Sequence, residues 1–411
     1  MTTFGIVVGG GPAPGINGVI GAAAQTALAA GHRVIGILDG MKHVMEGDAS
    51  HVVELKEEQV ARIHLQGGSI LHTSRANPTK KAELLENVVK SLDSLGVTHL
   101  VTIGGDDTAF SAKRVADTAA GRIKVAHVPK TIDNDLPLPQ LAPTFGFETA
   151  REHATTVVER ILEDTRTTGR WFFIIMMGRK AGHLALGAGK SAGATITLIP
   201  EEWGGAKIKF DEVVRVLEGS IVKRLAQGAP DGVAVIAEGV AEYLDPEELE
   251  ALKDAPRDEH GHVRLAEVPL GKVLRTAVAD ALAARGVKVQ IGDKDVGYEL
   301  RCGQPTAFDR DYTRDLGVGA VRTLLAGQSS VLITRQQGKI VPIPFAELMD
   351  PATGRTKVRL VDVDTDSFRN ARSLQTRVTK DDLADSGKLA ALAKAAKLTP
   401  EEAKVRYAVL L

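Results

Sequence analysis

Residues 99–135 read HLVTIGGDDTAFSAKRVADTAAGRIKVAHVPKTIDND. The stretch contains two short apolar runs, His99–Ile103 and Ile123–Val128, on either side of a segment of helical length, Phe110–Ala119. Short, almost continuous apolar runs are typical of strands in a parallel sheet whose two faces are both covered. The order strand, helix, strand therefore predicts a three-layer α/β fold.

The same alternation continues on both sides of this stretch. Further buried strands are expected at Phe4–Val8, Arg33–Leu38, Trp171–Met177, Thr195–Ile199 and Gly232–Ala237. Helices are expected at Ile16–Ala30, Lys81–Leu95, Thr149–Thr165 and Asp211–Ala226. Gly31 and Gly96 stand where helix C-caps should fall.

Three other segments organise the chain. The proline-rich stretch Leu136–Pro143 is interpreted as a crossing between two α/β units, because proline is excluded from helix interiors and central strands. Tyr243–Pro269 is dense in charge and is expected to form a helical surface excursion. After a strand at Val331–Thr334, the chain is expected to end in a helical segment, Lys380–Leu411.

Composition narrows the class of protein. The chain has 411 residues, of which 44% are apolar and 25% charged, as in a folded soluble protein of two or three domains. Aromatic residues make up only 4%, and the net charge is −1, so neither a nucleic-acid surface nor a membrane surface is expected. Cys302 is the only cysteine, which excludes an intramolecular disulfide and a cysteine-based metal cluster.

The N-terminus MTTFGIVVGGG lacks the basic start, the apolar stretch and the cleavage site of a signal peptide. No window approaches the ~18 apolar residues of a membrane-spanning helix. A cytoplasmic location is therefore expected.

A glycine loop, Gly9-Gly10-Gly11-Pro12-Ala13-Pro14-Gly15, follows the first strand and leads into a helix. Backbone N–H groups and the helix dipole at such a place favour an anion, although a tight turn alone would also use these glycines. The loop is not a Walker A sequence, because Ile16 and Asn17 replace the required Lys and Ser/Thr. Asp39 at the end of the second strand leaves a dinucleotide-binding interpretation open.

Two acidic loops follow the strands of the opening stretch. Gly104-Gly105-Asp106-Asp107-Thr108 would project two carboxylates at the sheet edge where ligands bind in open α/β sheets, and Mg²⁺ commonly uses such carboxylates together with substrate phosphates. The structural alternative is a turn with Asp106 as a helix N-cap. Pro129-Lys130-Thr131-Ile132-Asp133-Asn134-Asp135 can place a general base beside a lysine that meets a phosphoryl group, and a solvated turn is its structural alternative.

In this order, the glycine loop, GGDDT and PKTIDND closely resemble the phosphofructokinase family. Further matches follow in the family's order: Met177-Gly178-Arg179, Glu238-Gly239 and Tyr298-Glu299-Leu300-Arg301. Thr73-Ser74-Arg75 also matches, although His72 stands where the family usually has glycine. The resemblance spans roughly residues 4–330 and implies two similar three-layer α/β domains with the active site in the cleft between them.

The resemblance also implies the domain boundaries and the role of each matched residue. The phosphoryl-donor domain would comprise residues 1–145 and about 300–350, and the sugar-phosphate domain residues 146–299, with the tail 351–411 packed on it. Asp133 is the expected general base, in a catalytic group with Lys130, Arg179 and Asp135. Asp106 is the expected magnesium ligand. The donor would lie along Gly10, Arg75, Asp107 and Thr108, and the sugar phosphate would be held by Thr131, Arg170, Met177, Gly178, Glu238, Tyr298 and Arg301.

Each of these residues, taken alone, also has a purely structural interpretation. The arginines could be surface ion-pair partners, Met177 could be core, Glu238 could cap a turn and Tyr298 could be a packing residue. Arg170 matches a family arginine that reaches the sugar phosphate of a neighbouring subunit, which implies a homodimer or homotetramer.

Two positions decide the expected donor. Family members that use ATP usually carry glycine at the positions of Asp107 and Lys130. A carboxylate at 107 would occupy the space of a nucleotide α-phosphate and repel it, at a cost on the order of 1 kcal/mol in water and several times more in a partly desolvated cleft. Lys130 supplies positive charge to a compact donor and to the transition state. Both residues therefore favour pyrophosphate over ATP.

The expected activity is a reversible, magnesium-dependent transfer of a phosphoryl group from pyrophosphate to the 1-hydroxyl of fructose 6-phosphate, giving fructose 1,6-bisphosphate and phosphate. The alternatives are an ATP-using or donor-tolerant enzyme, a preference for sedoheptulose 7-phosphate, an NAD-dependent oxidoreductase, and a non-catalytic subunit of the same fold. Allosteric relatives carry effector-binding arginines in the first helix. The corresponding stretch here, Gly21-Ala22-Ala23-Ala24-Gln25, has no cation, so weak or absent nucleotide regulation is expected.

Overall fold

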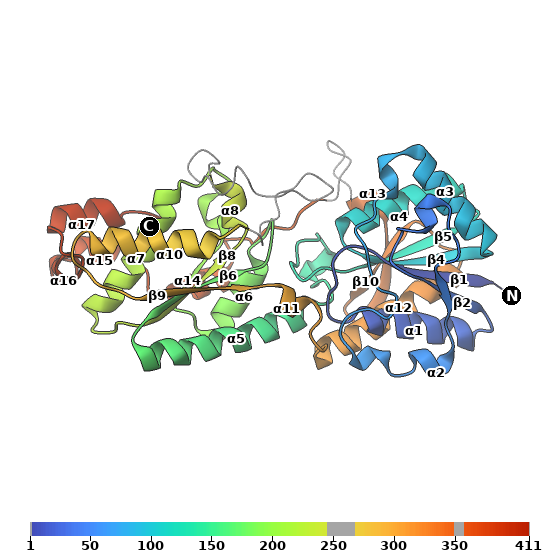
Figure 1. Cartoon of the computed structure of the whole chain (residues 1–411), viewed down its shortest axis with the longest axis horizontal. Coiled ribbons are helices and arrows are strands. Elements are labelled where there is room, and N and C mark those ends of the chain that lie inside the picture. Colours follow the sequence, from blue (N-terminus) through green and yellow to red (C-terminus); the bar gives the residue numbers. More distant parts are fainter. Residues whose placement is uncertain (1, 245–267, 349–356, 411) are drawn as a thin grey trace. The chain divides into compact units, whose positions relative to one another are not determined.

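The computed structural model describes residues 2–244, 268–348 and 357–410. These fall into two compact units, and Figure 1 shows their elements. Unit 1 comprises Met1–Ala150 and Glu299–Arg359, and unit 2 comprises Arg151–Tyr298 and Leu360–Leu411.

The chain leaves unit 1 inside helix α5 (Phe147–Thr168) rather than in the proline-rich stretch, which lies within unit 1. The first turn of α5 is anchored in unit 1 because the buried carboxylate of Asp309 accepts hydrogen bonds from the backbone N–H groups of Gly146 and Thr149, at 2.8 and 2.9 Å, and from the Thr149 hydroxyl, at 2.6 Å.

Unit 1 is built on a mostly parallel sheet with the strand order β11-β10-β5-β4-β1-β2-β3. Its strands are β1 (Thr3–Val8), β2 (Arg33–Ile37), β3 (Val52–Glu54), β4 (Val97–Gly104), β5 (Lys124–Pro129), β10 (Val331–Gln336) and β11 (Lys339–Pro344). Only the edge pairs β2–β3 and β10–β11 are antiparallel among the described strands of this sheet.

Helices cover both faces of this sheet. They are α1 (Ile16–Ala29), α2 (Glu57–Val60), α3 (Ala82–Ser94), α4 (Asp106–Ala119), α12 (Ala307–Leu325) and α13 (Phe345–Leu348). One apolar core joins α1 and α12 to Phe4, Ile6 and Val8 of β1, whereas the other joins α3 and α4 to Val7. In Figure 1, α3 and α4 lie above the strands of unit 1, and α1 and α12 lie below them. Alternate side chains of β1 therefore pack into two different cores, one on each face of the sheet, as a three-layer fold requires.

Unit 2 has a four-stranded parallel sheet with the order β7-β8-β6-β9. Its strands are β6 (Trp171–Met176), β7 (Ile196–Leu198), β8 (Gly232–Ala237) and β9 (Ile291–Val296). Its helices, besides most of α5, are α6 (His183–Ala192), α7 (Phe210–Ala226), α8 (Val240–Tyr243), α10 (Leu270–Ala283), α14 (Asp366–Ser373), α15 (Lys380–Ala384), α16 (Ser386–Ala396) and α17 (Pro400–Tyr407). The short helix α11 (Tyr298–Arg301) stands where the chain returns to unit 1. Single 3₁₀ turns occur at Val44–Glu46, Ile63–Leu65, Pro78–Lys80, Pro139–Leu141 and Pro200–Trp203.

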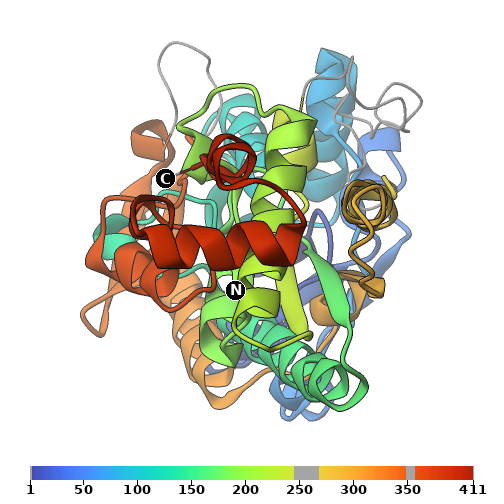
Figure 2. The ribbon, with the colours of Figure 1, turned by 90° about the vertical axis from the view of Figure 1, so that its left-hand side faces the viewer.

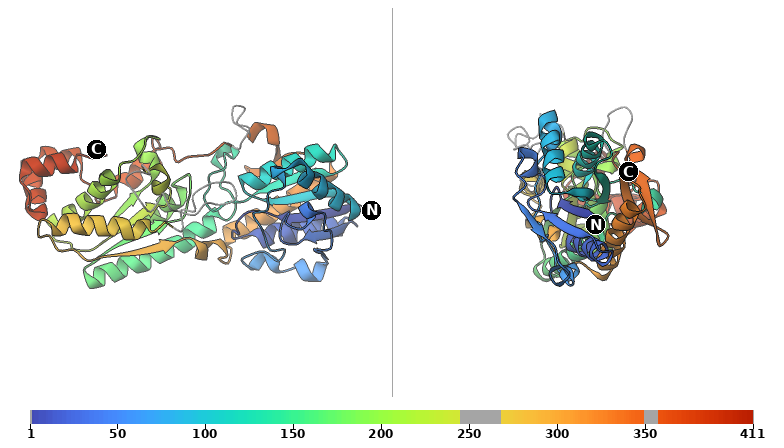
Figure 3. Two further views of the ribbon diagram at one scale, coloured as in Figure 1. Left: turned by 45° about the horizontal axis from the view of Figure 1, so that its top comes forward. Right: turned by 90° about the vertical axis from the view of Figure 1, so that its right-hand side faces the viewer.

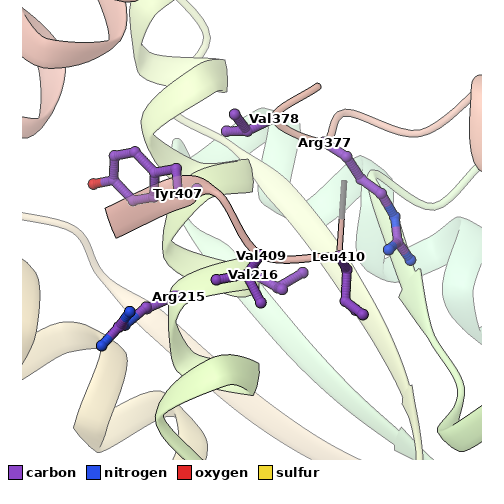
Figure 4. Close-up of a pocket in the computed structure, with 8 residues that line it drawn as sticks. Arg215, Val216, Arg377, Val378, Tyr407, Val409 and Leu410 are labelled. Carbon is purple, nitrogen blue, oxygen red and sulfur yellow. The ribbon is translucent and has the colours of Figure 1, made fainter. Parts of the chain in front are cut away.

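The C-terminal tail packs against α7 of unit 2. Figure 2 faces the tail helices, and the close-up in Figure 4 shows Tyr407 and Val378 beside the part of α7 that carries Val216. The anchor is Glu218 of α7, a fully buried carboxylate that accepts hydrogen bonds from Arg285, Arg406 and Tyr407. Burial opposes the ionisation of Glu218, but these hydrogen bonds outweigh it and lower the pKa of the carboxyl.

The expected strands and helices are confirmed, with ends that differ by a few residues. The largest difference is in α4, which begins at Asp106 rather than at Phe110, because Gly105 takes the N-cap position. Several elements, notably β9, α6, α10 and α12, were not expected from the sequence. β9 carries charged residues in the middle of the strand and so lacks an apolar run.

Of the expected surface excursion, residues 245–267 lie outside the described part of the chain. None of the described helices combines the length and the apolar run that a membrane span requires.

Candidate active site

Three loops of unit 1 meet at the carboxyl edge of its sheet. β1, β4 and β5 are parallel neighbours, and the glycine loop, GGDDT and PKTIDND follow them in turn. The Gly9 N–H donates to the Ile103 carbonyl at 2.8 Å, and the Lys130 N–H donates to the Gly104 carbonyl at 2.8 Å. The left-hand view of Figure 3 shows unit 1 from a second side, with the strands between two layers of helices. Hydrogen bonds at the strand ends thus fix the three loops to one another.

The glycine loop packs closely against its neighbours. A Cβ atom added to Gly9 would lie 2.6 Å from the Thr108 hydroxyl oxygen, and Gly10 has a φ of +81°, so both positions require glycine. Thr108, expected to bind the donor, therefore also fills the space between Gly9 and Gly104.

The segment that carries Arg75 is tied to the same loop. The Gly10 N–H donates to the Ser74 carbonyl at 2.9 Å, and the Thr73 hydroxyl donates to the Gly10 carbonyl at 2.7 Å. Asp39 contacts the residues just before this segment. Its N–H donates to the Leu71 carbonyl, and its carboxylate lies 3.1 Å from His72 Nδ1. The residue that kept a dinucleotide-binding interpretation open thus holds the loop of Arg75.

Asp106 and Asp107 form the first turn of α4. Gly105, not Asp106, occupies the N-cap position, and no side chain caps this helix, so the structural alternative for Asp106 is wrong. The Asp106 carboxylate accepts a hydrogen bond from the Asp107 N–H at 2.9 Å. Two carboxylates at a helix N-terminus are stabilised by the helix dipole. Their hard oxygen atoms are the ligands that Mg²⁺ prefers, so this turn fits a magnesium ion shared with substrate phosphates.

Lys130 is a buried cation beside the glycine loop. Its side chain donates to the Gly11 carbonyl, and the residue is only 5% exposed. Burial lowers the pKa of Lys130 to about 8, and the positive charges of Arg301 and Arg75 act in the same direction. The carboxylates of Asp133 and Asp106 act against this shift. The electrostatic influence of these four residues on one ammonium group indicates that unit 1 gathers them around it.

The PKTIDND loop after Lys130 is held by its own side chains. The Thr131 hydroxyl accepts a hydrogen bond from the Asp133 N–H at 3.0 Å. Thr144, which the sequence analysis did not single out, donates its hydroxyl to the Thr131 carbonyl at 2.8 Å and its N–H to Asn134 Oδ1 at 3.1 Å. These bonds order the backbone on both sides of the candidate base, Asp133.

His127 is a second residue that the sequence analysis missed. It is fully buried in β5, with Nε2 3.1 Å from the Gly104 carbonyl and Nδ1 2.8 Å from the Thr102 hydroxyl. Burial lowers the pKa of His127 to about 3, so the ring is neutral, and Nε2 carries the proton because a carbonyl can only accept. His127 thus supports the GGDDT loop from inside the sheet, and its only sequence signal is a histidine in an apolar strand.

Unit 2 collects most of the expected sugar-phosphate residues at the carboxyl edge of its own sheet. Glu238 Oε1 accepts the Gly178 N–H at 3.1 Å, which joins the ends of β6 and β8. A Cβ atom on Gly239 would lie 2.5 Å from the Arg179 carbonyl, and one on Gly297 would lie 2.7 Å from Met177 Cε. Tyr298 follows Gly297 directly and is exposed.

Three expected residues lie elsewhere, and one of them, Thr131, is in the PKTIDND loop of unit 1. Arg301 belongs to unit 1, where its guanidinium carbon lies 3.5 Å from the position of a Cβ on Gly11. Arg170 precedes β6 and Gly178 follows it, so the two lie at opposite ends of a strand of six residues, roughly 20 Å long at about 3.3 Å per residue. Its guanidinium donates to the Asp164 carboxylate at 2.7 and 3.1 Å.

The family model described as Phosphofructokinase matches residues 3–324. The chain belongs to the phosphofructokinase family. It is 54% identical over 409 residues to the pyrophosphate–fructose 6-phosphate 1-phosphotransferase of Thermotoga maritima, a match that covers 98% of this chain and 97% of that protein. It is 49% identical over 411 residues to the protein of the same name from Naegleria fowleri, with 98% and 94% covered.

Solved structures agree on the phosphofructokinase fold. The pyrophosphate-dependent phosphofructokinase of Nitrosospira multiformis superposes with a TM-score of 0.70 at 17% identity, over 96% of this chain and 92% of that one. The phosphofructokinase of Saccharomyces cerevisiae gives a TM-score of 0.67 at 22% identity, and this chain spans 48% of its length. The predicted phosphofructokinase-like α/β fold is thereby confirmed, and the role of each site residue stays a prediction.

Proposed function

We propose that this phosphofructokinase transfers a phosphoryl group from pyrophosphate to the 1-hydroxyl of fructose 6-phosphate. The observation that carries the proposal is the buried ammonium group of Lys130, which donates to the glycine loop and feels the charge of Asp106 in the first turn of α4. The relatives at 54% and 49% identity, which bear the name of this activity, support it.

The donor end of the reaction would be handled by unit 1. Lys130 and Arg75 would supply positive charge to a small polyanion, and the N–H groups of the glycine loop would add further donors. Asp107 lies exposed in the first turn of α4, where its charge would exclude the α-phosphate of a nucleotide. A Mg²⁺ ion held by Asp106 would neutralise charge on the donor phosphates.

The acceptor end needs a base, because a sugar hydroxyl is a poor nucleophile at neutral pH. The Asp133 carboxylate would take the proton of the 1-hydroxyl as that oxygen attacks the near phosphorus of pyrophosphate. The bond between that phosphorus and the bridging oxygen breaks, and orthophosphate leaves with the bridging oxygen and the bonding electron pair. Arg179 would stabilise the transferring group, and Met177, Gly178, Glu238, Tyr298, Thr131 and Arg301 would hold the sugar phosphate.

The proposal includes a cytoplasmic homodimer or homotetramer. Arg170 lies at the sheet edge remote from Gly178, so it would serve a neighbouring subunit's sugar phosphate rather than its own. Sedimentation of the purified protein, with Arg170→Ala as the variant, tests this part: the variant should stay assembled and show a raised KM for the sugar.

The decisive experiment is a side-by-side assay with Mg²⁺ and fructose 6-phosphate, using pyrophosphate or ATP as donor, repeated with sedoheptulose 7-phosphate as acceptor. Turnover with pyrophosphate and fructose 6-phosphate should exceed the other combinations. Brisk turnover with ATP and none with pyrophosphate would overturn the donor assignment. The oxidoreductase alternative is not favoured by the family match.

A further inference from the structure

Arg359 lies beyond the part of the chain that matches the family model, which ends at residue 324. It is nevertheless one of the most highly bonded side chains of unit 1. Its guanidinium donates from Nε and Nη2 to the Asn134 carbonyl, at 3.0 and 2.9 Å, and from Nη1 to the Ala142 carbonyl at 2.9 Å. Nη2 also contacts Asn134 Oδ1, and the Arg359 N–H donates to the Asp135 carbonyl at 2.7 Å. All of these contacts are on or next to the loop that carries Asp133.

The residue that Arg359 binds most is in an unusual conformation. Asn134 has a φ of +56° and is buried, and it stands between the two carboxylates Asp133 and Asp135. Most residues other than glycine avoid a left-handed conformation; asparagine adopts it more readily, and hydrogen bonds from its surroundings then select it. The guanidinium bonds to the carbonyl and the side chain of Asn134 at once, so it is placed to impose that turn.

The geometry of the fork matters as much as its charge. A planar guanidinium can meet the carbonyls of Asn134 and Ala142 together, whereas a lysine ammonium is a single point donor. Both acceptors are backbone carbonyl oxygens, so the bonds fix the path of the chain. A backbone shift at Asn134 would turn the Asp133 side chain away from its target.

We propose that Arg359 is a positioning residue for phosphoryl transfer, whose guanidinium locks the left-handed turn at Asn134 and thereby sets the direction of the Asp133 carboxylate. The proposal rests on the proposed role of Asp133 as the general base. It assigns the tail beyond the family model a part in the reaction, although Arg359 itself touches no reacting atom.

The test compares Arg359→Met and Arg359→Lys with the wild type in the pyrophosphate and fructose 6-phosphate assay. Because small misplacements of a catalytic group cost on the order of 100-fold in rate, kcat of Arg359→Met should fall roughly 10- to 100-fold while both KM values stay within about 2-fold. Arg359→Lys should retain more activity than Arg359→Met but less than the wild type. Free guanidinium ion at millimolar concentration should restore part of the activity of Arg359→Ala.

Arg335→Met is the matched control. Arg335 is a half-buried arginine of the same unit, on β10, and it pairs with Asp311 and Asp315 rather than with the PKTIDND loop. Its kcat should stay within about 2-fold of the wild type. Circular dichroism identifies a variant that does not fold, and in that case Arg359→Lys and the guanidinium rescue decide.

Asp133→Asn is assayed in parallel to separate the two proposals. If Asp133→Asn is inactive and Arg359→Met retains the wild-type kcat, the role of Arg359 is refuted and that of Asp133 stands. A raised KM with unchanged kcat in Arg359→Met would also refute it, since that pattern indicates lost binding rather than misplaced chemistry. If Asp133→Asn retains wild-type kcat, the role of Asp133 is wrong and the inference drawn for Arg359 falls with it.

Discussion

Replacing Lys130 by methionine should change the stability of the protein in a pH-dependent way that only a buried lysine can produce. The unfolded chain holds a lysine proton with a pKa of 10.5, whereas burial in the folded protein lowers the pKa of Lys130 to about 8. At about 1.4 kcal/mol for each pKa unit, the difference amounts to about 3 kcal/mol.

The sign follows from proton binding. Between pH 8 and pH 10.5 the unfolded state binds more protons at this position than the folded state, so the wild type gains stability as the pH rises. The gain is complete above pH 10.5, and the full penalty is present below pH 8. The methionine variant lacks this contribution. The difference in unfolding free energy, wild type minus variant, should therefore rise by about 3 kcal/mol across this window.

The assay is urea unfolding followed by far-UV circular dichroism at several pH values. Tryptophan fluorescence is unsuitable because both tryptophans, Trp171 and Trp203, lie in unit 2, whereas Lys130 lies in unit 1. Lys90→Met, which removes an exposed lysine from α3, is the control for loss of a lysine. Subtracting the unfolding free energy of the variant from that of the wild type at each pH cancels the contributions of tyrosines and other lysines that titrate in the same range.

The reasoning is refuted if the difference curve is flat between pH 8 and pH 10.5, because Lys130 would then keep its proton as readily when folded as when unfolded. The activity arm has its own expectation. The kcat/KM for pyrophosphate of the wild type should decline above about pH 8, as the free enzyme loses the Lys130 charge. The kcat/KM of Lys130→Met for pyrophosphate should be lower than that of the wild type by roughly 30-fold or more, the effect of removing one partner of a buried charged contact.

Three further substitutions test other parts of the structure. Asp107→Gly should raise turnover with ATP relative to pyrophosphate by roughly 5- to 100-fold, because it removes a charge worth on the order of 1 to several kcal/mol against an α-phosphate; an unchanged donor ratio in paired assays would contradict this. Glu218→Ala should lower the unfolding free energy by about 3 kcal/mol, measured by urea unfolding, since it leaves the half-buried guanidinium groups of Arg285 and Arg406 without this carboxylate. The kcat of the folded variant should be unaffected, and an unchanged unfolding free energy would show that the network contributes little. The unfolding free energy of His127→Leu at pH 7 should be about 2–4 kcal/mol lower than that of the wild type, because the Gly104 carbonyl and the Thr102 hydroxyl lose their partner. The wild-type advantage over His127→Leu should shrink as the pH falls from 6.5 towards 3, where the unfolded histidine takes up a proton that the folded ring refuses, and a pH-independent difference would rule this out.

Much of the fold could be read from local patterns. Runs such as Gly232–Ala237 are apolar at every position because both faces of the sheet are covered, and this strand was expected with its observed ends. β9 was missed because Asp293, Lys294 and Asp295 interrupt its pattern. Among the strands that the structure describes, β9 pairs with β6 alone and so lies at the edge of its sheet. A strand at the edge of a sheet does not have to be apolar at every position, so the local sequence of β9 contains no pattern that predicts a strand.

The same distinction, between what local patterns predict and what they miss, applies to the candidate site. The sequence by itself determined the family, the order of strands and loops, and the residue types of GGDDT and PKTIDND, because these are encoded in short contiguous segments. Only the tertiary structure decided that Lys130 is buried and that His127 supports the Gly104 loop. It also decided that Arg359 donates hydrogen bonds to Asn134, which lies 225 positions away in the chain. Hydrophobic periodicity reports whether a residue is covered, but a hydrogen-bond partner or a shifted pKa depends on which distant segment does the covering, and that is fixed only when the chain has folded.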